Sequence, residues 1–345
     1  MDWLSFDSDL TQNFVIIDVR SESEFLQGHI PGAYNVPVLN DEHRKIVGTI
    51  YKQSGKEKAV LKGLELLGPD ISSRLKLAIQ FCKEEQNIIV HCWRGGMRSQ
   101  FFAFIMEFYG YKVKVLQGGY KAYRNHVLNT FNLSHKINVL GGKTGSGKTH
   151  VLNELKSKGA AMIDLEGLAC HRGSSFGSIG MPPQPSQEQF ENELSLQLFL
   201  LNKSTIWIED EGRTVGSRVI PEGLWLQMRK APHYFLNTNF EMRLDQIMID
   251  YGSFPIEELL VAMERIGKRL GPQHVKTALE AINIGDLKEA FTMALTYYDK
   301  AYTFQKEKHP LGEKIEVENL FVLDRYCIEN FLFDRESTCN FVYLN

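Results

Sequence analysis

A cysteine followed by glycines and arginines is the first feature of this sequence whose residue types could carry chemistry. Residues 91–99 read HCWRGGMRS, and Cys92 follows the apolar run Ile88-Ile89-Val90. A short β-branched run predicts a buried strand, so the cysteine lies where that strand ends. Glycines let backbone N–H groups form an anion-binding ring, and Arg94 and Arg98 add positive charge that stabilises a thiolate. Cys92 is therefore a candidate nucleophile, and the alternative is an inert, buried structural cysteine.

A second glycine-rich stretch, residues 141–149, reads GGKTGSGKT and contains the pattern G-x-x-x-x-G-K-[ST]. The run before it predicts a strand and the run after it predicts a helix, which is the context of a phosphate-binding P-loop. Its backbone amides would surround phosphates, Lys148 would neutralise phosphate charge, and Thr149 would hold Mg²⁺. The predicted diphosphate-binding residues of this loop are Gly142, Thr144, Gly145, Ser146, Gly147, Lys148 and Thr149.

The run STIWIEDE, residues 204–211, predicts an apolar strand that ends in carboxylates. P-loop proteins place an acid that orders Mg²⁺ or water at such a strand end. We therefore assign Glu209 and Asp210 to the phosphate site and expect Thr149 and Asp210 to be Mg²⁺ ligands; an ordinary polar strand end is the alternative. In the segment HRGSSFG, Arg172 and Phe176 are candidates for further contacts with an anionic ligand that also has an apolar part.

Basic residues in the second half of the chain are candidates for binding phosphate or RNA. Arg213 lies close in sequence to the acidic strand, and the others fall in a region whose apolar spacing predicts helices. A solvated protein surface explains such charges equally well. The candidates are Arg213, Arg265, Lys268, Arg269 and Lys276.

Length and composition describe an ordinary globular protein. A chain of 345 residues is expected to form about two domains, and its formal net charge of −3 argues against a uniformly basic surface. Five cysteines without paired metal spacing indicate reduced thiols. We find no signal-peptide pattern at the N-terminus and no apolar stretch of membrane-spanning length, so we expect a soluble cytoplasmic protein.

The first third of the chain alternates predicted strands and helices, which indicates a parallel α/β sheet. The stretch IDVRSESEFLQGHIPGAYNVP, the cysteine loop and LQGGYKAYR together resemble a rhodanese domain over about residues 2–129. That resemblance implies that Cys92 carries sulfur or selenium, and Asp18 and Arg20 match family residues that we interpret as structural. We expect a rhodanese-like domain over residues 1–130 with an insertion at about 41–76, and a P-loop α/β domain with a helical C-terminal region over 131–345.

The cysteine loop departs from common small rhodaneses, because five residues separate Cys92 from Arg98. This spacing is also that of cysteine-dependent phosphatases, in which a thiolate attacks phosphorus while amides and an arginine hold the oxygens. Those enzymes need a general acid that the sequence does not locate. Either chemistry requires a pocket that admits a tetrahedral anion.

The pairing of a rhodanese domain with a P-loop domain resembles the tRNA 2-selenouridine synthase family nearly end to end. The most specific stretches are VHCWRGGMRSQ, LGGKTGSGKT, HRGSSFG and GKRLG at residues 267–271. The resemblance implies that 2-thiouridine at the tRNA wobble position is geranylated with geranyl diphosphate and that selenium from selenophosphate then replaces the geranylthio group. It also implies tRNA and a selenophosphate-producing enzyme as partners, with Mg²⁺ as cofactor at the P-loop.

Two other classes of function remain open at this point. One is an ATP-dependent sulfurtransferase or kinase-type activating enzyme with a fused sulfur carrier, and hydrolysis of ATP that depends on Lys148 would favour it. The other is a non-catalytic RNA-binding module, against which an intact Cys92 in an arginine-rich loop argues. The sequence does not indicate an oligomeric state.

Overall fold

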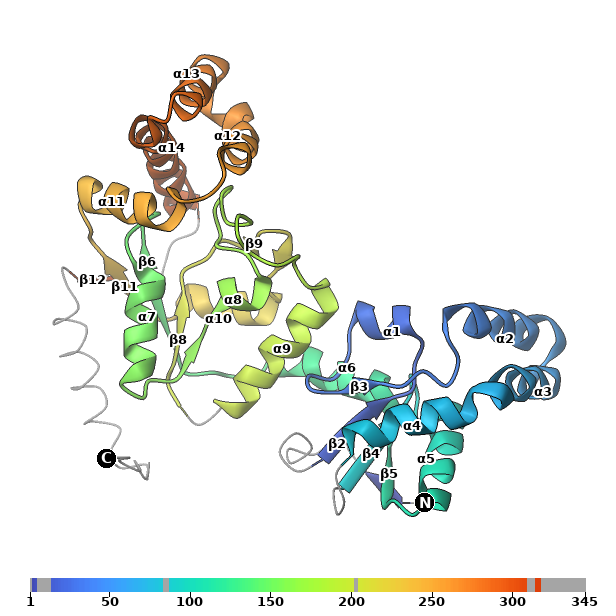
Figure 1. Ribbon diagram of the computed structural model, residues 1–345. Helices are drawn as coiled ribbons and strands as arrows, with labels where there is room; N and C mark the ends of the chain where they lie inside the picture. The colour runs from blue at the N-terminus through green and yellow to red at the C-terminus, as the bar shows by residue number, and fades with distance from the viewer. Residues whose placement is uncertain (1, 5–13, 83–86, 202–203, 309–313, 318–345) are drawn as a thin grey trace, which may run out of the picture. The chain divides into compact units, whose positions relative to one another are not determined.

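The computed structural model of the protein (Figure 1) describes residues 2–4, 14–82, 87–201, 204–308 and 314–317. The chain forms two compact units. Unit 1 comprises Met1–Asn132 and Pro185–Leu196, and unit 2 comprises Leu133–Gln184 and Gln197–Asn345. Pro185–Leu196 belongs to unit 1, although it lies beyond the domain boundary expected after residue 130. In the described part of the chain, no helix has the length and apolarity that crossing a membrane requires.

Unit 1 is built on a five-stranded sheet whose strand pairs all run parallel. The strands, in order across the sheet, are β1 (Asp2–Leu4), β5 (Val113–Leu116), β4 (Asn87–His91), β2 (Phe14–Asp18) and β3 (Tyr34–Asn35). Buried β-branched runs form the central strands, as is typical of a parallel sheet covered on both faces. The expected α/β fold is confirmed.

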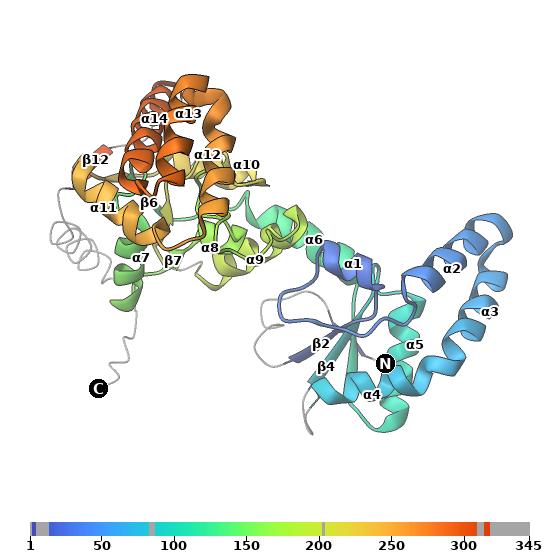
Figure 2. The same ribbon diagram turned by 45° about the horizontal axis from the view of Figure 1, so that its top comes forward.

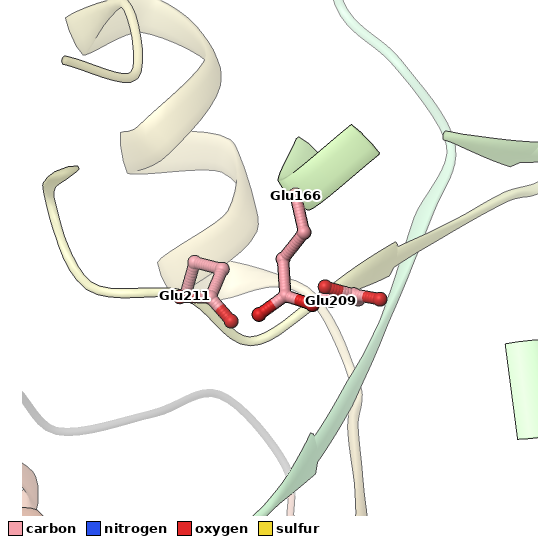
Figure 3. A group of neighbouring side chains, drawn as sticks. All are labelled: Glu166, Glu209 and Glu211. Carbon is pink, nitrogen blue, oxygen red and sulfur yellow. The ribbon is translucent and has the colours of Figure 1, made fainter. Parts of the chain in front are cut away.

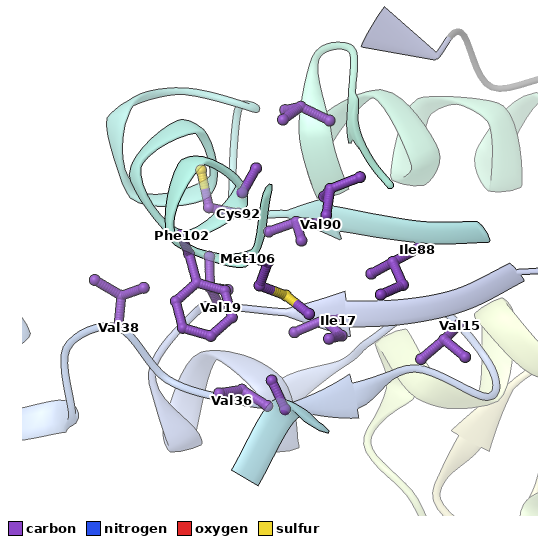
Figure 4. Close-up of a cluster of buried hydrophobic side chains, with 14 of the residues drawn as sticks. Val15, Ile17, Val19, Val36, Val38, Ile88, Val90, Cys92, Phe102 and Met106 are labelled. Carbon is purple, nitrogen blue, oxygen red and sulfur yellow. The ribbon is translucent and has the colours of Figure 1, made fainter. Parts of the chain in front are cut away.

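Four helices of unit 1 lie next to the strands in the chain. These helices are α1 (Glu22–Gln27), α4 (Ile71–Phe81), α5 (Met97–Tyr109) and α6 (Gly119–Thr130). The cysteine loop leaves the carboxyl end of β4 and leads into one of them, α5. Phe102 and Met106 of α5 pack on Ile17 and Val90 of the central strands (Figure 4), and Cys92 lies at the edge of this core. The cysteine therefore follows directly from the most buried part of the sheet.

The insertion expected at residues 41–76 is helical. It consists of α2 (Asp41–Ser54), α3 (Lys56–Leu67), a single 3₁₀ turn (Gly68–Asp70) and the start of α4. Asn40 caps α2 by accepting a hydrogen bond from the backbone of His43 at 2.8 Å. Gly55, with φ = +88°, separates α2 from α3, and the two helices pack against each other.

Helix α9 (Gln187–Leu200) begins in unit 1, where its first turns carry a polar network. Gln189 accepts a hydrogen bond from the backbone N–H of His29 at 2.8 Å, and Asn192 donates one to the His29 carbonyl at 2.8 Å. Tyr120 of α6 donates to Glu188 at 2.7 Å. These long-range polar contacts explain why the hydrophobic pattern alone does not assign the segment to unit 1.

Unit 2 contains a second five-stranded parallel sheet with β6 at its centre. Its strands, in order, are β12 (Lys314–Val317), β11 (His233–Leu236), β6 (Ile137–Gly142), β8 (Ile206–Glu209) and β7 (Met162–Ile163). A short hairpin of β9 (Thr214–Val215) and β10 (Arg218–Val219) follows β8. In an open parallel sheet of this kind, ligands bind at the carboxyl ends of the strands where the strand order reverses.

Helices account for most of the rest of unit 2 (Figure 2). They are α7 (Lys148–Ser157), α8 (Leu165–Ala169), α10 (Glu222–Lys230), α11 (Phe240–Tyr251), α12 (Ile256–Leu270), α13 (Pro272–Asn283) and α14 (Leu287–Lys308). Helices α11 to α14 form most of a second hydrophobic cluster, which includes Leu259, Met263 and Phe291. The expected helical C-terminal region is therefore present, and it packs beside the P-loop because α11 directly follows β11.

Candidate functional sites

The cysteine loop leaves β4 at its carboxyl end and leads into α5. Cys92 is only 4% exposed, and its Sγ lies 3.3 Å from Oγ of Ser99 in the first turn of α5. The Ser99 hydroxyl also lies 3.0 Å from the Gly96 carbonyl, to which it donates when Cys92 is a thiol. If Cys92 is a thiolate, the Ser99 hydroxyl can instead donate its hydrogen to the sulfur. The N-terminus of α5 also favours a negative charge at this position.

The two arginines of the loop lie in different surroundings. Arg98 donates to Glu24 at 2.7 Å, and Arg44 approaches the same carboxylate at 3.7 Å. Although burial of Glu24 opposes ionisation, the hydrogen bond and charge of Arg98 hold its pKa below the usual value. Arg94 is exposed and forms no ion pair with another described residue. Arg94 is therefore open to an incoming anion, whereas Arg98 is held by Glu24.

The backbone of the cysteine loop packs against a turn at Gly119, a position that only glycine accommodates. Gly119 has φ = +58°, and a Cβ atom there would lie 2.3 Å from the Cys92 carbonyl oxygen. The backbone N–H of Tyr120 donates to that oxygen at 2.9 Å. The ring of Tyr120 lies 3.7 Å from the guanidinium of Arg20, which is buried and paired with Asp18 at 2.6 Å. Asp18 and Arg20 thus have the structural position that we expected.

The P-loop connects β6 to α7 and lines a cavity of about 940 Å³ in unit 2. Gly147 caps α7 with φ = +81°, and the Lys148 ammonium lies 3.1 Å from the Gly142 carbonyl. A helix N-terminus with successive backbone N–H groups is an anion-binding site. All seven predicted diphosphate-binding residues of the loop line the cavity: Gly142, Thr144, Gly145, Ser146, Gly147, Lys148 and Thr149.

A buried ion pair between two helices holds the P-loop in place. Arg243 of α11 binds Asp299 of α14 with two hydrogen bonds of 2.7 and 2.8 Å and donates to the Thr144 carbonyl at 3.2 Å. Lys143 lies 3.3 Å from the same aspartate. These contacts bind the loop to the helical region, an arrangement that no local sequence pattern indicated.

Three glutamates form the strongest electrostatic feature beside the P-loop (Figure 3). Glu166, Glu209 and Glu211 each offer a carboxylate oxygen within 4.8 Å of the others, and Thr149 Oγ1 lies 3.4 Å from Glu166. Glu209 is fully buried, and neither of its carboxylate oxygens has a hydrogen-bond partner among the described residues. Burial raises the pKa of all three, and that of Glu211 reaches about 8; repulsion by Glu166 adds to the shift at Glu209 and Glu211, and repulsion by Asp164 adds to it at Glu166.

These glutamates fit a divalent cation. Mg²⁺ prefers oxygen ligands, and a buried carboxylate without a partner needs a cation or a proton. The expected ligand Asp210 is not part of the group, because it pairs with Arg229 at 2.9 Å and accepts from Tyr302 at 3.3 Å. Strand β8 ends at Glu209, and the Glu211 backbone N–H donates to the Glu209 carbonyl at 3.0 Å. A tight turn at Asp210 therefore separates its side chain from those of the two glutamates.

Two members of this group, Glu166 and Glu211, are not among the residues predicted from the sequence. Glu211 belongs to the acidic run whose two preceding residues we selected. Glu166 follows the short strand β7, and a carboxylate just after a strand of a parallel sheet is the same signal that identified Glu209. Since β7 has only two residues, its apolar pattern was too short to identify a strand.

The two residues predicted from HRGSSFG take different places. Arg172 lines the cavity, and its guanidinium lies 5.7 Å from the ring of Tyr251. Phe176 is instead buried in the α11–α14 cluster, with its ring centroid 5.7 Å from that of Phe291, so it does not face the cavity. Other side chains supply the apolar lining: Trp225, Ile247, Tyr251, Tyr297, Tyr298 and Tyr302.

The predicted basic residues whose side chains the structure describes, Arg213, Arg265 and Lys276, have different surroundings. Arg213 lines the P-loop cavity and stacks on Trp225 at 5.1 Å, and Arg265 donates to Ser178 at 3.0 Å. Lys276 is 80% exposed and lies 3.9 Å from Glu280. The side chains of residues 268 and 269, which are Lys268 and Arg269 of α12, lie outside the described part of the structure. Their predicted role in binding tRNA stays a prediction.

Comparison with known proteins finds matches to both units. The model described as tRNA 2-selenouridine synthase AAA domain matches residues 135–254, and that of the rhodanese-like domain matches residues 5–126. The tRNA 2-selenouridine synthase of Psychromonas ingrahamii is 33% identical over 326 residues, covering 85% of this chain and 88% of that protein. That of Sulfurovum sp. is 35% identical over 339 residues, covering 88% and 92%. That of Nitrosomonas europaea is 37% identical over 255 residues, covering 70% and 66%.

Proposed function

This chain belongs to the tRNA 2-selenouridine synthase family, and from that premise we propose that it converts 2-thiouridine to 2-selenouridine at the wobble position of tRNA. The proposed reaction has two steps. Geranyl diphosphate first alkylates the sulfur, and selenium from selenophosphate then replaces the geranylthio group. We assign the first step to the P-loop cavity of unit 2 and the selenium to the cysteine loop of unit 1.

The observation that carries the first step is the mixed lining of the P-loop cavity. One part consists of P-loop amides, Lys148 and Arg172, which suit a diphosphate. Another part consists of the aromatic side chains Tyr297, Tyr298 and Tyr302, which suit an unsaturated hydrocarbon chain. A nucleotide would also bind the amides, but an allylic diphosphate uses both kinds of lining. The P-loop then serves as a diphosphate clamp and not as an ATPase.

We propose that Thr149, Glu166 and Glu211, which line this cavity, hold Mg²⁺ together with the buried Glu209 behind them. The orphaned carboxylate of Glu209 and the short distance from Thr149 to Glu166 support this assignment. When bound, the cation would neutralise charge that develops on the departing diphosphate. Lys148 and the N-terminus of α7 act on the same charge from the protein side.

The order of the two steps has a chemical reason. A thiocarbonyl sulfur is a poor leaving group, whereas an alkylated sulfur leaves as a thiolate. In the first step the sulfur attacks C1 of the geranyl chain, the C1–O bond breaks, diphosphate departs and the base loses its N3 proton. In the second step selenium attacks C2, the C2–S bond breaks, geranylthiolate leaves and takes a proton, and water cleaves the P–Se bond to release phosphate.

In this scheme the cysteine loop binds the selenium donor. Backbone amides after Cys92 and the exposed Arg94 suit the phosphate oxygens of selenophosphate. The sulfur of Cys92 lies beside Ser99 at the first turn of α5, where an anionic chalcogen is stabilised. Cys92 is assigned to the wall of the anion pocket, because selenium in selenophosphate is at the selenide level and would need a two-electron oxidant to become a perselenide. Mass spectrometry of the protein after incubation with selenophosphate tests this assignment, since a mass increase of one selenium on Cys92 would contradict it.

The test is mass spectrometry of 2-thiouridine tRNA after incubation with the protein, Mg²⁺ and geranyl diphosphate, and again after selenophosphate is added. Lys148→Ala is expected to abolish geranylation, whereas Cys92→Ala is expected to retain geranylation and lose selenium incorporation. Cys92→Ala supplied with previously geranylated tRNA isolates the second step. If the wild-type protein never geranylates tRNA but hydrolyses ATP, the kinase-type alternative replaces this proposal.

A further inference from the structure

The helical hairpin of α2 and α3 is the part of unit 1 that neither proposed reaction step uses. Helices α2 and α3 lie side by side in both views of the molecule and extend away from the sheet (Figures 1 and 2). Helix α2 has 14 residues, so it is about 21 Å long at 1.5 Å per residue. The two helices are joined at Gly55 without a longer loop and pack against each other.

The tip of this hairpin, which we define as residues 45–58, is strongly basic. It contains four lysines and one glutamate, a net charge of +3 within a chain of net charge −3. Lys52, Lys56 and Lys58 are exposed, and none of them forms an ion pair with another described residue. Tyr51, between these lysines and the base of α2, is 54% exposed. No ion pair within the described part of the chain neutralises these lysines, so their charge is available to a partner.

The base of the hairpin is tied to the cysteine loop. Asp41, the first residue of α2, accepts hydrogen bonds from the backbone and the hydroxyl of Ser23 on α1. One turn along α2, Arg44 lies 3.7 Å from Glu24, and Glu24 binds Arg98 of the cysteine loop. The basic tip is therefore held at a fixed distance from the site that we assign to selenium.

We propose that the hairpin tip binds the RNA substrate, with its lysines on backbone phosphates and Tyr51 stacked on an unpaired base. This inference rests on the proposed function, because it takes RNA as the substrate. Lysines neutralise phosphates without regard to sequence, and an aromatic ring among them provides a stacking platform for single-stranded bases. An anticodon loop presents both phosphates and unstacked bases. An acidic partner protein is the competing occupant, and the experiment separates the two.

The experiment measures binding of tRNA that carries 2-thiouridine, before geranylation, to the full-length protein over a range of salt concentrations. The variant is Lys52→Glu/Lys56→Glu/Lys58→Glu. Its matched control is Lys76→Glu/Lys112→Glu/Lys156→Glu, which changes the net charge equally at three exposed lysines outside the tip. The tip variant is expected to bind at least about 10-fold more weakly at low salt. Its dependence of log K on log [salt] is expected to fall by about 2 units, because each lost phosphate contact removes about 0.7–0.9.

A second pair of variants tests the stacking. Tyr51→Ala is expected to weaken tRNA binding several-fold without changing the salt slope, whereas Tyr51→Phe is expected to retain the affinity. Equal affinity and slope for the tip variant and its control would overturn the inference while leaving the proposed function intact. Loss of binding to an acidic partner protein, with tRNA binding unchanged, would assign the surface to protein instead. If the wild-type protein bound no tRNA at all, the proposed function itself would fall.

Discussion

Glu24 and Arg98 form an ion pair of 2.7 Å at the cysteine loop, so the arginine expected to hold an anion is already held by a carboxylate. Glu24 sits at the third position of α1, where its side chain also accepts from the Ser21 backbone at 3.1 Å. The capping box of a short helix thus sets the position of an arginine 74 residues later. An anion that binds at Cys92 must compete with Glu24 for Arg98 or use Arg94 alone.

Replacing Glu24 by Gln is expected to tighten binding of an anion at the cysteine loop, because it frees the charge of Arg98. We expect the Kd for inorganic phosphate, used as a probe, to fall about 3- to 10-fold, a change typical of one partly exposed charge pair. Isothermal titration calorimetry of the full-length protein measures it. Glu22→Gln, on the same helix but paired with the Asp41 backbone, is the control. An unchanged or weaker affinity in Glu24→Gln would show that the pair orients Arg98 for binding.

The glutamate cluster is expected to make stability depend on pH. Glu209 and Glu211 have raised pKa values in the folded protein, that of Glu211 about 8, so they hold protons that the unfolded chain has released by about pH 5. The folded state then binds more protons than the unfolded state, and stability falls as pH rises from about 5 to 8. We expect Tm to decrease over this range without Mg²⁺ and to recover when Mg²⁺ is added.

Glu209→Gln tests the same cluster, because it keeps the shape and removes a charge. The variant is expected to have a Tm that changes less between pH 5 and 8 and that no longer responds to Mg²⁺. Asp210→Asn is the comparison, since Asp210 pairs with Arg229 and not with the cluster. A Mg²⁺ response that disappears in Asp210→Asn and persists in Glu209→Gln would restore the original assignment of Asp210 as a ligand.

Lys148→Ala is expected to weaken binding of inorganic diphosphate by about 100-fold, because a charge-assisted contact with a buried anion is worth about 1.5–3 kcal/mol. Lys156→Ala, at an exposed position on the same helix, is expected to bind as the wild type does. Calorimetry with inorganic diphosphate and Mg²⁺ measures both. Equal affinities for the two variants would contradict a diphosphate clamp at the P-loop.

The aromatic lining is expected to recognise the hydrocarbon chain. Going from dimethylallyl to geranyl diphosphate adds five carbons, and burying them fully is worth about 4 kcal/mol, on the order of 1,000-fold in affinity. Tyr297→Ala is expected to lose most of this gain while binding inorganic diphosphate normally, and Tyr297→Phe is expected to keep it. If the wild-type protein binds both diphosphates equally, the chain does not enter this lining.

Gly119→Ala is expected to destabilise unit 1 and disrupt the cysteine loop. The substitution forces a left-handed conformation on alanine, which costs about 1–2 kcal/mol, and places Cβ against the Cys92 carbonyl. Gly32→Ala is the matched control, because Gly32 has φ = +80° but open space around it. Urea unfolding of both variants separates the cost of the left-handed backbone, which both share, from the cost of the contact between Cβ and the Cys92 carbonyl, which only Gly119→Ala has. A loss of stability in Gly119→Ala no larger than in Gly32→Ala would mean that the backbone of the cysteine loop shifts at little cost to make room for the added Cβ.

The sequence alone determined those features of this protein that depend on residues adjacent in the chain. The cysteine loop after β4 and the P-loop between β6 and α7 were predicted with their surroundings, because strand, glycine turn and helix follow one another directly. The parallel α/β class followed from alternating strands and helices, and the family from the pairing of two such motifs. In each case the residues that carry the signal are adjacent, so spacing alone is sufficient.

Only the tertiary structure decided which side chains meet across distant segments. Arg98 pairs with Glu24, Glu166 joins Glu209 and Glu211, and Asp210 turns away toward Arg229. Phe176 was wrongly expected in the cavity because its core partners lie more than 70 residues farther along the chain. Such contacts depend on where whole strands and helices pack, and packing is set by the summed burial of many residues that no single motif contains.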